Sequence, residues 1–258
     1  MEIIFGIHAV GEALVAGARP FEYVGISASR TDARIRKVIE LCWTVGVPVR
    51  DFSQEKLTRL AKTSHHQGVI AVTIEKKYDD LNDVLAAKRG NYSFLLVLDE
   101  IQHPHNLGAI IRTAEGSGAD GIVIPQRRAV GVTATVAKAA AGATEYLPIA
   151  RVTNIGRAIE DIKSHNIWTV GLDERGAQLY DKLDYNMDCA LVLGAEGHGL
   201  HEQVRKKCDF LVSIPMLGKV PSLNVSVAAA VVMYEIARQR RNKFSHESTR
   251  INTNQEQV

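Results

Sequence analysis

The segment FLLVLDEIQHPHNLGAIIRTA, residues 94–114, joins an apolar run to a polar loop and then to a helical pattern. A short apolar run bounded by polar residues is typical of a strand that is buried on both faces. Similar runs recur at Gly121–Ile124, Ile167–Val170, Ala190–Leu193 and Phe210–Ile214, with helical segments between them. This alternation predicts an α/β fold with a mainly parallel sheet covered by helices on both faces.

The residues before this region have a pattern of their own. Helical periodicity at Ile7–Val15 and Ala33–Val45 alternates with extended stretches at Phe21–Ile26 and Gly68–Ile74. The pattern predicts a small α/β domain over residues 1–75.

Composition and charge place the remaining boundaries. The polar segment 76–92 is predicted to be a linker, 93–243 a second domain, and the polar end 244–258 a disordered tail. The C-terminal helical pattern begins near Ser222 and is apolar on nearly every side through Ala237. A helix of this kind requires burial all round, so we expect it to form a subunit interface.

The overall composition is that of an ordinary globular protein. Of the 258 residues, 46% are hydrophobic and 23% are charged, with a net charge of +2. Any nucleic-acid-binding face must therefore be local, and basic groups occur at Arg127–Arg128, Lys206–Lys207 and Arg238–Lys243. The three cysteines are scattered, which argues against a disulfide framework. Without a signal-peptide pattern or a long apolar run, we expect a cytoplasmic protein with no membrane partner.

The loop after the first quoted strand carries Asn106 and Arg112. Ligands of open α/β sheets bind at this edge. Asn106 can cap the following helix, contact a ligand or hold a neighbouring loop. Arg112 follows about two helical turns later. Taken alone, each residue also has an ordinary structural interpretation, as a cap and as a surface cation.

Two further strands end in candidate ligand-binding loops. The segment LVLGAEGHGL, residues 191–200, encloses Glu196 among glycines that let the backbone approach a ligand closely, although a plain tight turn would look the same. The segment IPMLGKVPSLNVS, residues 214–226, brings Ser222 and Asn224 to a helix N-terminus. Unpaired N–H groups there can bind an anion, or Ser222 can simply be the N-cap. Neither segment has the spacing of a dinucleotide or Walker loop.

In this order, the three motifs resemble the signature of the SpoU-class (TrmH-like) RNA 2′-O-ribose methyltransferases, over residues 94–241. The stretches IFGIHAV, residues 4–10, and HQGVIA, residues 66–71, resemble the RNA-binding domain of the bacterial 23S rRNA guanosine 2′-O-methyltransferase subgroup. One departure is His103, where family members often carry aspartate. It puts in doubt only a local loop interaction.

The resemblance implies an architecture that no periodicity reveals. It implies a deep C-terminal trefoil knot of the SPOUT type within residues 93–243, a homodimer formed through the knotted domain, and a small L30-like N-terminal domain that binds RNA. It also implies S-adenosyl-L-methionine as the cofactor and a ribose 2′-hydroxyl as the methyl acceptor. The N-terminal likeness favours a guanosine of 23S rRNA over tRNA.

The resemblance also assigns site residues. Those expected to hold the cofactor are Leu193, Gly194, Gly199, Ile214, Met216, Ser222 and Leu223. Those expected in the catalytic set are Asn106, Arg112, Glu196, Ser222 and Asn224. We expect Arg112 to stabilise charge rather than to act as a base, because a guanidinium is hard to deprotonate. Methyl transfer from a sulfonium requires no metal, so the histidines His65, His66, His198 and His201 are expected to be solvated or loop residues.

Two alternatives from other functional classes remain open. A non-catalytic RNA-binding ribosome-assembly factor could keep this architecture, although retention of Arg112 and Glu196 argues against it. Another nucleotide-dependent α/β enzyme is disfavoured by the missing phosphate-loop and dinucleotide patterns.

Overall fold

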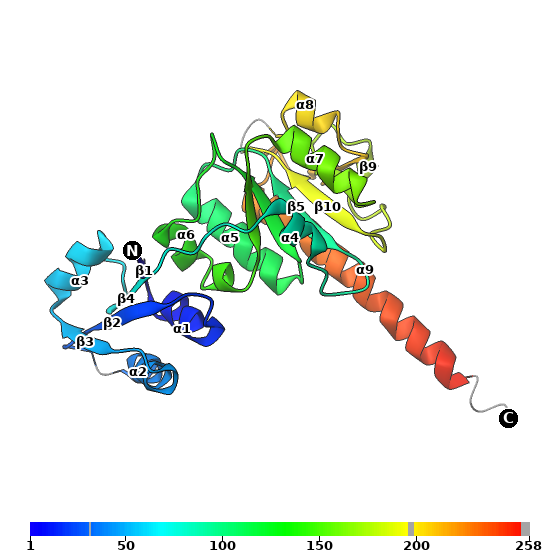
Figure 1. Cartoon of the computed structure of the whole chain (residues 1–258). Coiled ribbons are helices and arrows are strands. Elements are labelled where there is room, and N and C mark those ends of the chain that lie inside the picture. Colours follow the sequence, from blue (N-terminus) through cyan, green and yellow to red (C-terminus); the bar gives the residue numbers. More distant parts are fainter. Residues whose placement is uncertain (31, 196–198, 254–258) are drawn as a thin grey trace. The chain divides into compact units, whose positions relative to one another are not determined.

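The structure, a computed structural model, describes residues 1–30, 32–195 and 199–253, and the chain forms two compact units (Figure 1). The first contains Met1–Asp79, His103–Arg112 and Val130–Pro148, and the second contains Asp80–Gln102, Thr113–Ala129 and the chain from Ile149. The predicted domain over 1–75 thus lies within the first unit. That unit also takes in two segments of the region predicted as the second domain.

The first unit contains a four-stranded sheet in the order β1-β4-β2-β3. Its strands are β1 (Glu2–Phe5), β2 (Phe21–Ser27), β3 (Val49–Phe52) and β4 (Val69–Thr73). The helices α1 (Ile7–Ala16) and α2 (Ala33–Val45) bury their apolar residues with Val24, Ile26 and Val69 of the sheet. Leu57 of α3 (Gln54–Ala61) packs in a separate cluster with Phe5 and Ile70. The small α/β unit that the sequence predicted is therefore present, with β1 and β3 added.

A long-range hydrogen bond closes the start of α1. Gly6 precedes the helix with φ 98° and offers no side chain as a cap. Instead, the side-chain Oε1 of Gln67 accepts a hydrogen bond from the backbone N–H of Ile7 at 3.0 Å. This bond joins the two N-terminal stretches that carried the resemblance.

The neighbouring His66 lies in the loop between α3 and β4, which is one of the two placements expected for it, but its side chain is buried. Its Nδ1 accepts a hydrogen bond from the backbone N–H of Gly68 at 3.0 Å, and its Nε2 lies 3.1 Å from the Thr58 hydroxyl. The burial could not be predicted, because no local pattern shows that α3 brings a polar partner over this position.

The remaining elements of the first unit are the start of α5 (Pro104–Gly116), α6 (Ala134–Ala139) and a 3₁₀ turn, η1 (Ala143–Glu145). Gly108 lets α5 approach α6 closely, because a Cβ at this position would lie 2.4 Å from the Cβ of Ala139. Arg19 donates to both carboxylate oxygens of the buried Glu145, at 3.0 and 2.8 Å, and to Glu2 at 2.5 Å. This ion pair ties η1 to the N-terminal sheet.

The second unit is built on a seven-stranded sheet in the order β7-β6-β5-β10-β8-β11-β9. Each pairing is parallel, so the prediction of an α/β fold with a mainly parallel sheet is confirmed. In chain order the strands are β5 (Phe94–Leu98), β6 (Gly121–Pro125), β7 (Ile149–Val152), β8 (Trp168–Leu172), β9 (Gln178–Leu179), β10 (Cys189–Leu193) and β11 (Phe210–Ser213). The short strands β7 and β9 were not predicted.

Helices bury the apolar side chains of this sheet. Side chains of α4 (Leu81–Ala86), α7 (Ile155–Ser164) and α8 (Glu202–Arg205) form one cluster with alternate residues of β5 and β10. The last helix, α9 (Val225–Thr253), contacts β10, and none of its described side chains belongs to that cluster. No helix among the described residues is both long enough and apolar enough to cross a membrane.

Two arginines of the basic run in α9 have partners within the protein. Arg240 donates hydrogen bonds to the backbone carbonyls of Tyr92, Ser93, Tyr185 and Met187, at 2.8 to 3.2 Å. Arg238 pairs with Glu235 on the same helix. The sequence suggested that Arg240 could contact a phosphate. In the structure its guanidinium is instead hydrogen-bonded within the protein.

The helix α9 also extends further than expected. It continues to Thr253, so it replaces the predicted disordered tail over 244–253, where no glycine or proline interrupts the helix. Residues 254–258 of that predicted tail lie outside the described residues.

Replacing Arg19 by methionine should leave the Glu145 carboxylate without this ion-pair partner, in a side chain that is only 1% exposed. Because an unpaired buried charge is strongly unfavourable, we expect the free energy of unfolding to fall by about 3–5 kcal/mol. Chemical denaturation measures this loss. The double variant Arg19→Met/Glu145→Met should be clearly more stable than the single variant. Equal losses in the two proteins would show that the ion pair is not the cause.

Candidate functional site

A cavity of about 290 Å³ lies at the carboxyl ends of β8, β10 and β11. This is the edge at which open α/β sheets bind ligands. The structure brings together at this cavity all seven residues expected to hold a cofactor: Leu193, Gly194, Gly199, Ile214, Met216, Ser222 and Leu223. Two of the three predicted loops therefore converge on one space. The role of each residue in ligand binding stays a prediction.

The loop after β10 depends on its glycines. A Cβ at Gly194 would lie 2.1 Å from the carbonyl carbon and oxygen of Gly199, which leaves room for no side chain. Ala195 and Gly199 exchange two backbone hydrogen bonds of 3.0 Å, and Gly199 has φ 65°. The chain thus folds back tightly and presents backbone to the cavity. Glu196, predicted to be catalytic, lies outside the described residues.

The third motif ends in a helix cap, at a different residue from the one expected. Helix α9 begins at Val225, and the side-chain oxygen of Asn224 accepts from the backbone N–H of Ser226 at 2.9 Å and from its hydroxyl at 2.6 Å. Asn224 is therefore the cap and Ser222 is not. The prediction differed because either residue type can cap, and only the start of the helix decides between them. Ser222 lines the cavity instead.

A third segment that lines the cavity was not predicted. It consists of Leu172 at the end of β8 and the charged residues Asp173, Glu174 and Arg175 that follow. Asp173 is only 4% exposed, and its carboxylate accepts hydrogen bonds from Arg175, which hold its pKa below the usual value. The available signal was that β8 ends at the same edge as β10, so a polar run after it should face the same space.

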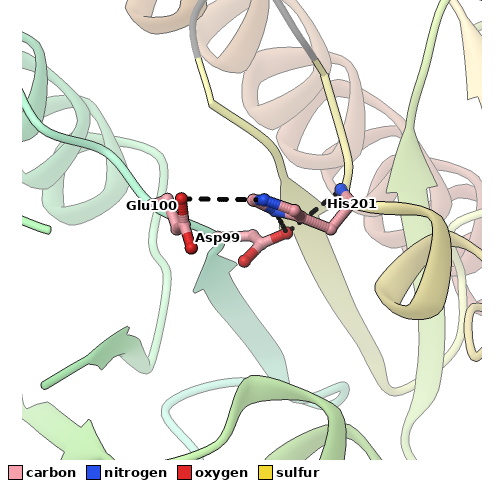
Figure 2. A group of neighbouring side chains, drawn as sticks. All are labelled: Asp99, Glu100 and His201. Atoms are coloured by element: carbon pink, nitrogen blue, oxygen red, sulfur yellow. Dashed lines mark hydrogen bonds and ion pairs between the residues drawn. The ribbon is translucent and has the colours of Figure 1, made fainter. Parts of the chain in front are cut away.

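Beside the β10 loop, Asp99, Glu100 and His201 form a polar cluster (Figure 2). The Asp99 carboxylate accepts hydrogen bonds from His201 Nδ1 at 2.9 Å and from its backbone N–H at 3.2 Å. Glu100 lies 3.7 Å from His201 Nε2 and pairs with Arg128 at 3.4 Å. The hydrogen bond and charge of Asp99 raise the pKa of His201. Asp99 thereby anchors the end of the glycine loop to the end of β5.

These three side chains also place potential metal-ligand atoms within 4.8 Å of one another. The sequence led us to expect no metal site, and the described residues contain one cluster with the spacing of metal ligands. The hydrogen bonds offer a sufficient account of the arrangement, because the imidazole and Arg128 already satisfy the two carboxylates. His201 is thus a half-exposed loop residue, as expected, and it also has a structural partner.

The first motif lies on α5, in a stretch that belongs to the first unit. The helix begins at Pro104, a residue suited to the first helical position, so Asn106 lies within the first turn and is not the cap. Arg112 is exposed two turns along the helix. The catalytic roles expected for Asn106 and Arg112 stay predictions.

Comparison with known proteins agrees with this arrangement. Residues 93–234 match the SpoU rRNA methylase family, and residues 3–79 match the family described as RNA 2′-O ribose methyltransferase substrate binding. The chain belongs to the SpoU rRNA methylase family. YacO of Bacillus subtilis, whose name assigns it to the TrmH family of tRNA/rRNA methyltransferases, is 43% identical over 241 residues, covering 93% of this chain and 96% of YacO.

Solved structures of SpoU proteins share the fold. The SpoU methyltransferase AviRb from Streptomyces viridochromogenes, in complex with the cofactor AdoMet, has a TM-score of 0.78 at 27% identity. The match covers 93% of this chain and 90% of AviRb. The TrmH/SpoU tRNA modifying enzyme of A. aeolicus has a TM-score of 0.54 at 26% identity, covering 63% of this chain and 82% of that enzyme. Membership of the SpoU family, inferred from the three motifs, is confirmed.

In this SpoU protein, Gly194→Ala should disrupt the β10 loop because the added methyl group overlaps the Gly199 peptide. We expect the free energy of unfolding to fall by about 1–3 kcal/mol, which is the usual cost of overpacking. Gly90→Ala is the matched control, since a Cβ there meets nothing within 4 Å. Denaturant titration should separate the two variants, and similar values for both would contradict the tight approach.

The Asp99–His201 pair makes a pH-dependent contribution to stability. The raised pKa of His201 means that folding favours the protonated ring. Its contribution is present below the unfolded pKa of about 6.5 and is lost as the pH rises through the folded value. His201→Gln should therefore destabilise the protein more at low pH than at high pH, by less than about 1 kcal/mol because the side chain is half-exposed. Thermal melts of the wild type and the variant at pH values below and above the pKa of His201 test this trend. A stability difference that does not change with pH would refute it.

Proposed function

We propose that this protein transfers a methyl group from S-adenosyl-L-methionine to the 2′-hydroxyl of a ribose in RNA. The observation that carries the proposal is the convergence of the β10 and β11 loops of the SpoU motifs on one cavity. The N-terminal match to an RNA 2′-O ribose methyltransferase substrate-binding family supports RNA as the partner and the ribose hydroxyl as the acceptor. AviRb, with the same fold, has been crystallised with the cofactor.

The chemistry of the cavity fits this cofactor. Ile214, Leu223 and Leu193 offer apolar surface for an adenosine, and the absence of side chains at Gly194 and Gly199 allows backbone groups to approach it. When bound, S-adenosylmethionine supplies an electrophilic methyl group on a positively charged sulfur. Asp173 and Glu174 add negative charge to the cavity wall, which suits a ligand with cationic groups.

The protein must position the ribose oxygen and stabilise its developing negative charge. We assign the second task to Arg112, whose guanidinium can donate hydrogen bonds to an anionic oxygen. Glu196 and Asn224 would orient Arg112 or the ribose, Ser222 would line the cofactor pocket, and Asn106 would hold the motif loops and the dimer contact. Asn224 is also the cap of α9, so the start of that helix would fix the position of its side chain for this orienting role.

We further propose that the domain over residues 93–243 contains the deep C-terminal trefoil knot of the SPOUT fold. The strand order supports this, because β10 inserts between β5 and β8, two strands that precede it in the chain. A homodimer formed through this domain is supported by the exposed apolar residues of α9, among them Val227 at 49% and Tyr234 at 55% exposure. The N-terminal α/β sheet would then be the L30-like RNA-binding domain, in a protein of the cytoplasm.

For the RNA target we propose a guanosine of 23S rRNA. The N-terminal motifs support rRNA, while relatives bear names that include both tRNA and rRNA. Mapping ribose methylation in RNA from cells with and without the protein identifies the target. If the cells without the protein lack a ribose methyl group in tRNA instead of rRNA, tRNA is the substrate. The reaction class would be unchanged.

Replacing Arg112 by alanine should reduce methyl transfer by about 100-fold or more, the usual effect of removing one group that stabilises transition-state charge. Transfer of labelled methyl groups to RNA measures this loss. Binding of S-adenosylhomocysteine, followed by calorimetry and by thermal stabilisation, should be unchanged. Undiminished transfer by the variant would remove Arg112 from the mechanism. A wild-type protein with no affinity for the cofactor product would instead favour a non-catalytic RNA-binding factor.

A further inference from the structure

The cavity at the ends of β8, β10 and β11 has one cationic residue among the lining residues that the structure describes. The lining is mostly apolar or glycine, and its charged members are Asp173, Glu174 and Arg175. The Arg175 side chain is 49% exposed, whereas the Asp173 side chain beside it is 1% exposed. An accessible guanidinium thus stands on a buried carboxylate at the edge of a ligand-sized space.

Asp173 holds the guanidinium in one orientation. Nε of Arg175 donates to one carboxylate oxygen at 2.7 Å and Nη2 donates to the other at 2.8 Å. The backbone N–H of Arg175 also donates to Asp173 at 2.9 Å. This two-point contact fixes the plane of the guanidinium, so little further side-chain entropy is lost when a ligand binds.

The contact leaves part of the guanidinium available. Nη1 lies 3.9 Å from a Glu202 oxygen, which is beyond hydrogen-bond distance, and it makes no hydrogen bond within the described part of the chain. The pair with Asp173 explains how a buried carboxylate is neutralised. It does not use all five donors of the arginine. A planar carboxylate or a similar anion is the partner that such donors fit best.

We propose that Arg175 binds the carboxylate of the amino-acid portion of S-adenosylmethionine, with Asp173 as the positioning residue. This inference rests on the proposed function. Of the charged groups of the cofactor, the sulfonium and the ammonium are cations and only the carboxylate is an anion. Asp173 and Glu174 suit the cations, and Arg175 is the lining residue with the opposite charge. The segment after β8 would therefore select a ligand with an intact amino-acid portion over a truncated nucleoside.

The test compares two ligands that differ only in this carboxylate: S-adenosylmethionine and its decarboxylated form. Calorimetry without RNA measures their dissociation constants for the wild-type protein, Arg175→Ala, Arg175→Lys and the surface control Arg157→Ala. Arg175→Ala should weaken the binding of S-adenosylmethionine by about tenfold, as expected for loss of a charge-assisted hydrogen bond. The dissociation constant of the decarboxylated ligand should change by less than about twofold. Arg157→Ala should change neither, since Arg157 is exposed on α7 away from the lining residues.

Arg175→Lys keeps a charge beside Asp173 and so guards against a variant that fails to fold. It should lie between wild type and Arg175→Ala for S-adenosylmethionine, because lysine lacks the planar fork. Equal weakening of both ligands in the alanine and lysine variants would overturn the inference and make Arg175 a structural residue. Unchanged affinity for both ligands would overturn it as well. A wild-type protein that binds neither ligand would instead refute the proposed function itself.

Discussion

The close approach of Gly194 to the Gly199–Leu200 peptide is the constraint on which the site depends. A Cβ at Gly194 would stand 2.1 Å from the Gly199 carbonyl, so the chain can fold back at the end of β10 only without a side chain there. Strand β10 pairs with β5 and β8 up to its last residue, Leu193. The fold-back therefore fixes where the β10 loop meets the other two loops of the cavity. A change at Gly194 would displace the cavity wall and the end of the central strand β10 together.

Burial decides which parts of this architecture could be predicted from sequence. The central strands β5 and β10 are buried along their whole length and leave continuous apolar runs in the sequence. The edge strand β7 exposes Arg151, and β9 is only Gln178–Leu179, so neither leaves such a run. Glycines and caps predicted two loops of the cavity. The third, Asp173–Arg175, looks like ordinary surface sequence, because only the fold shows that Asp173 is buried.

Contacts between distant residues account for most of the differences. The bond from Ile7 to Gln67 spans 60 residues, and the pair of Arg19 and Glu145 spans 126. The second of these links the segment before β2 to η1, within the first unit, which also contains residues 130–148. Local patterns do predict the helices themselves, and α2 occupies Ala33–Val45 as expected, but they leave the choice of capping residue open.

The order of the strands in the larger sheet has a consequence for biogenesis. During synthesis β5 and β8 leave the ribosome before β10, which must later take its place between them. Until residues 189–193 emerge, both neighbours expose unpaired backbone edges flanked by apolar side chains. Such edges invite pairing with other chains, and contacts between residues this far apart in sequence form slowly. The nascent polypeptide is thus open to aggregation through these edges in the interval before β10 emerges, when chaperones would be of use to it.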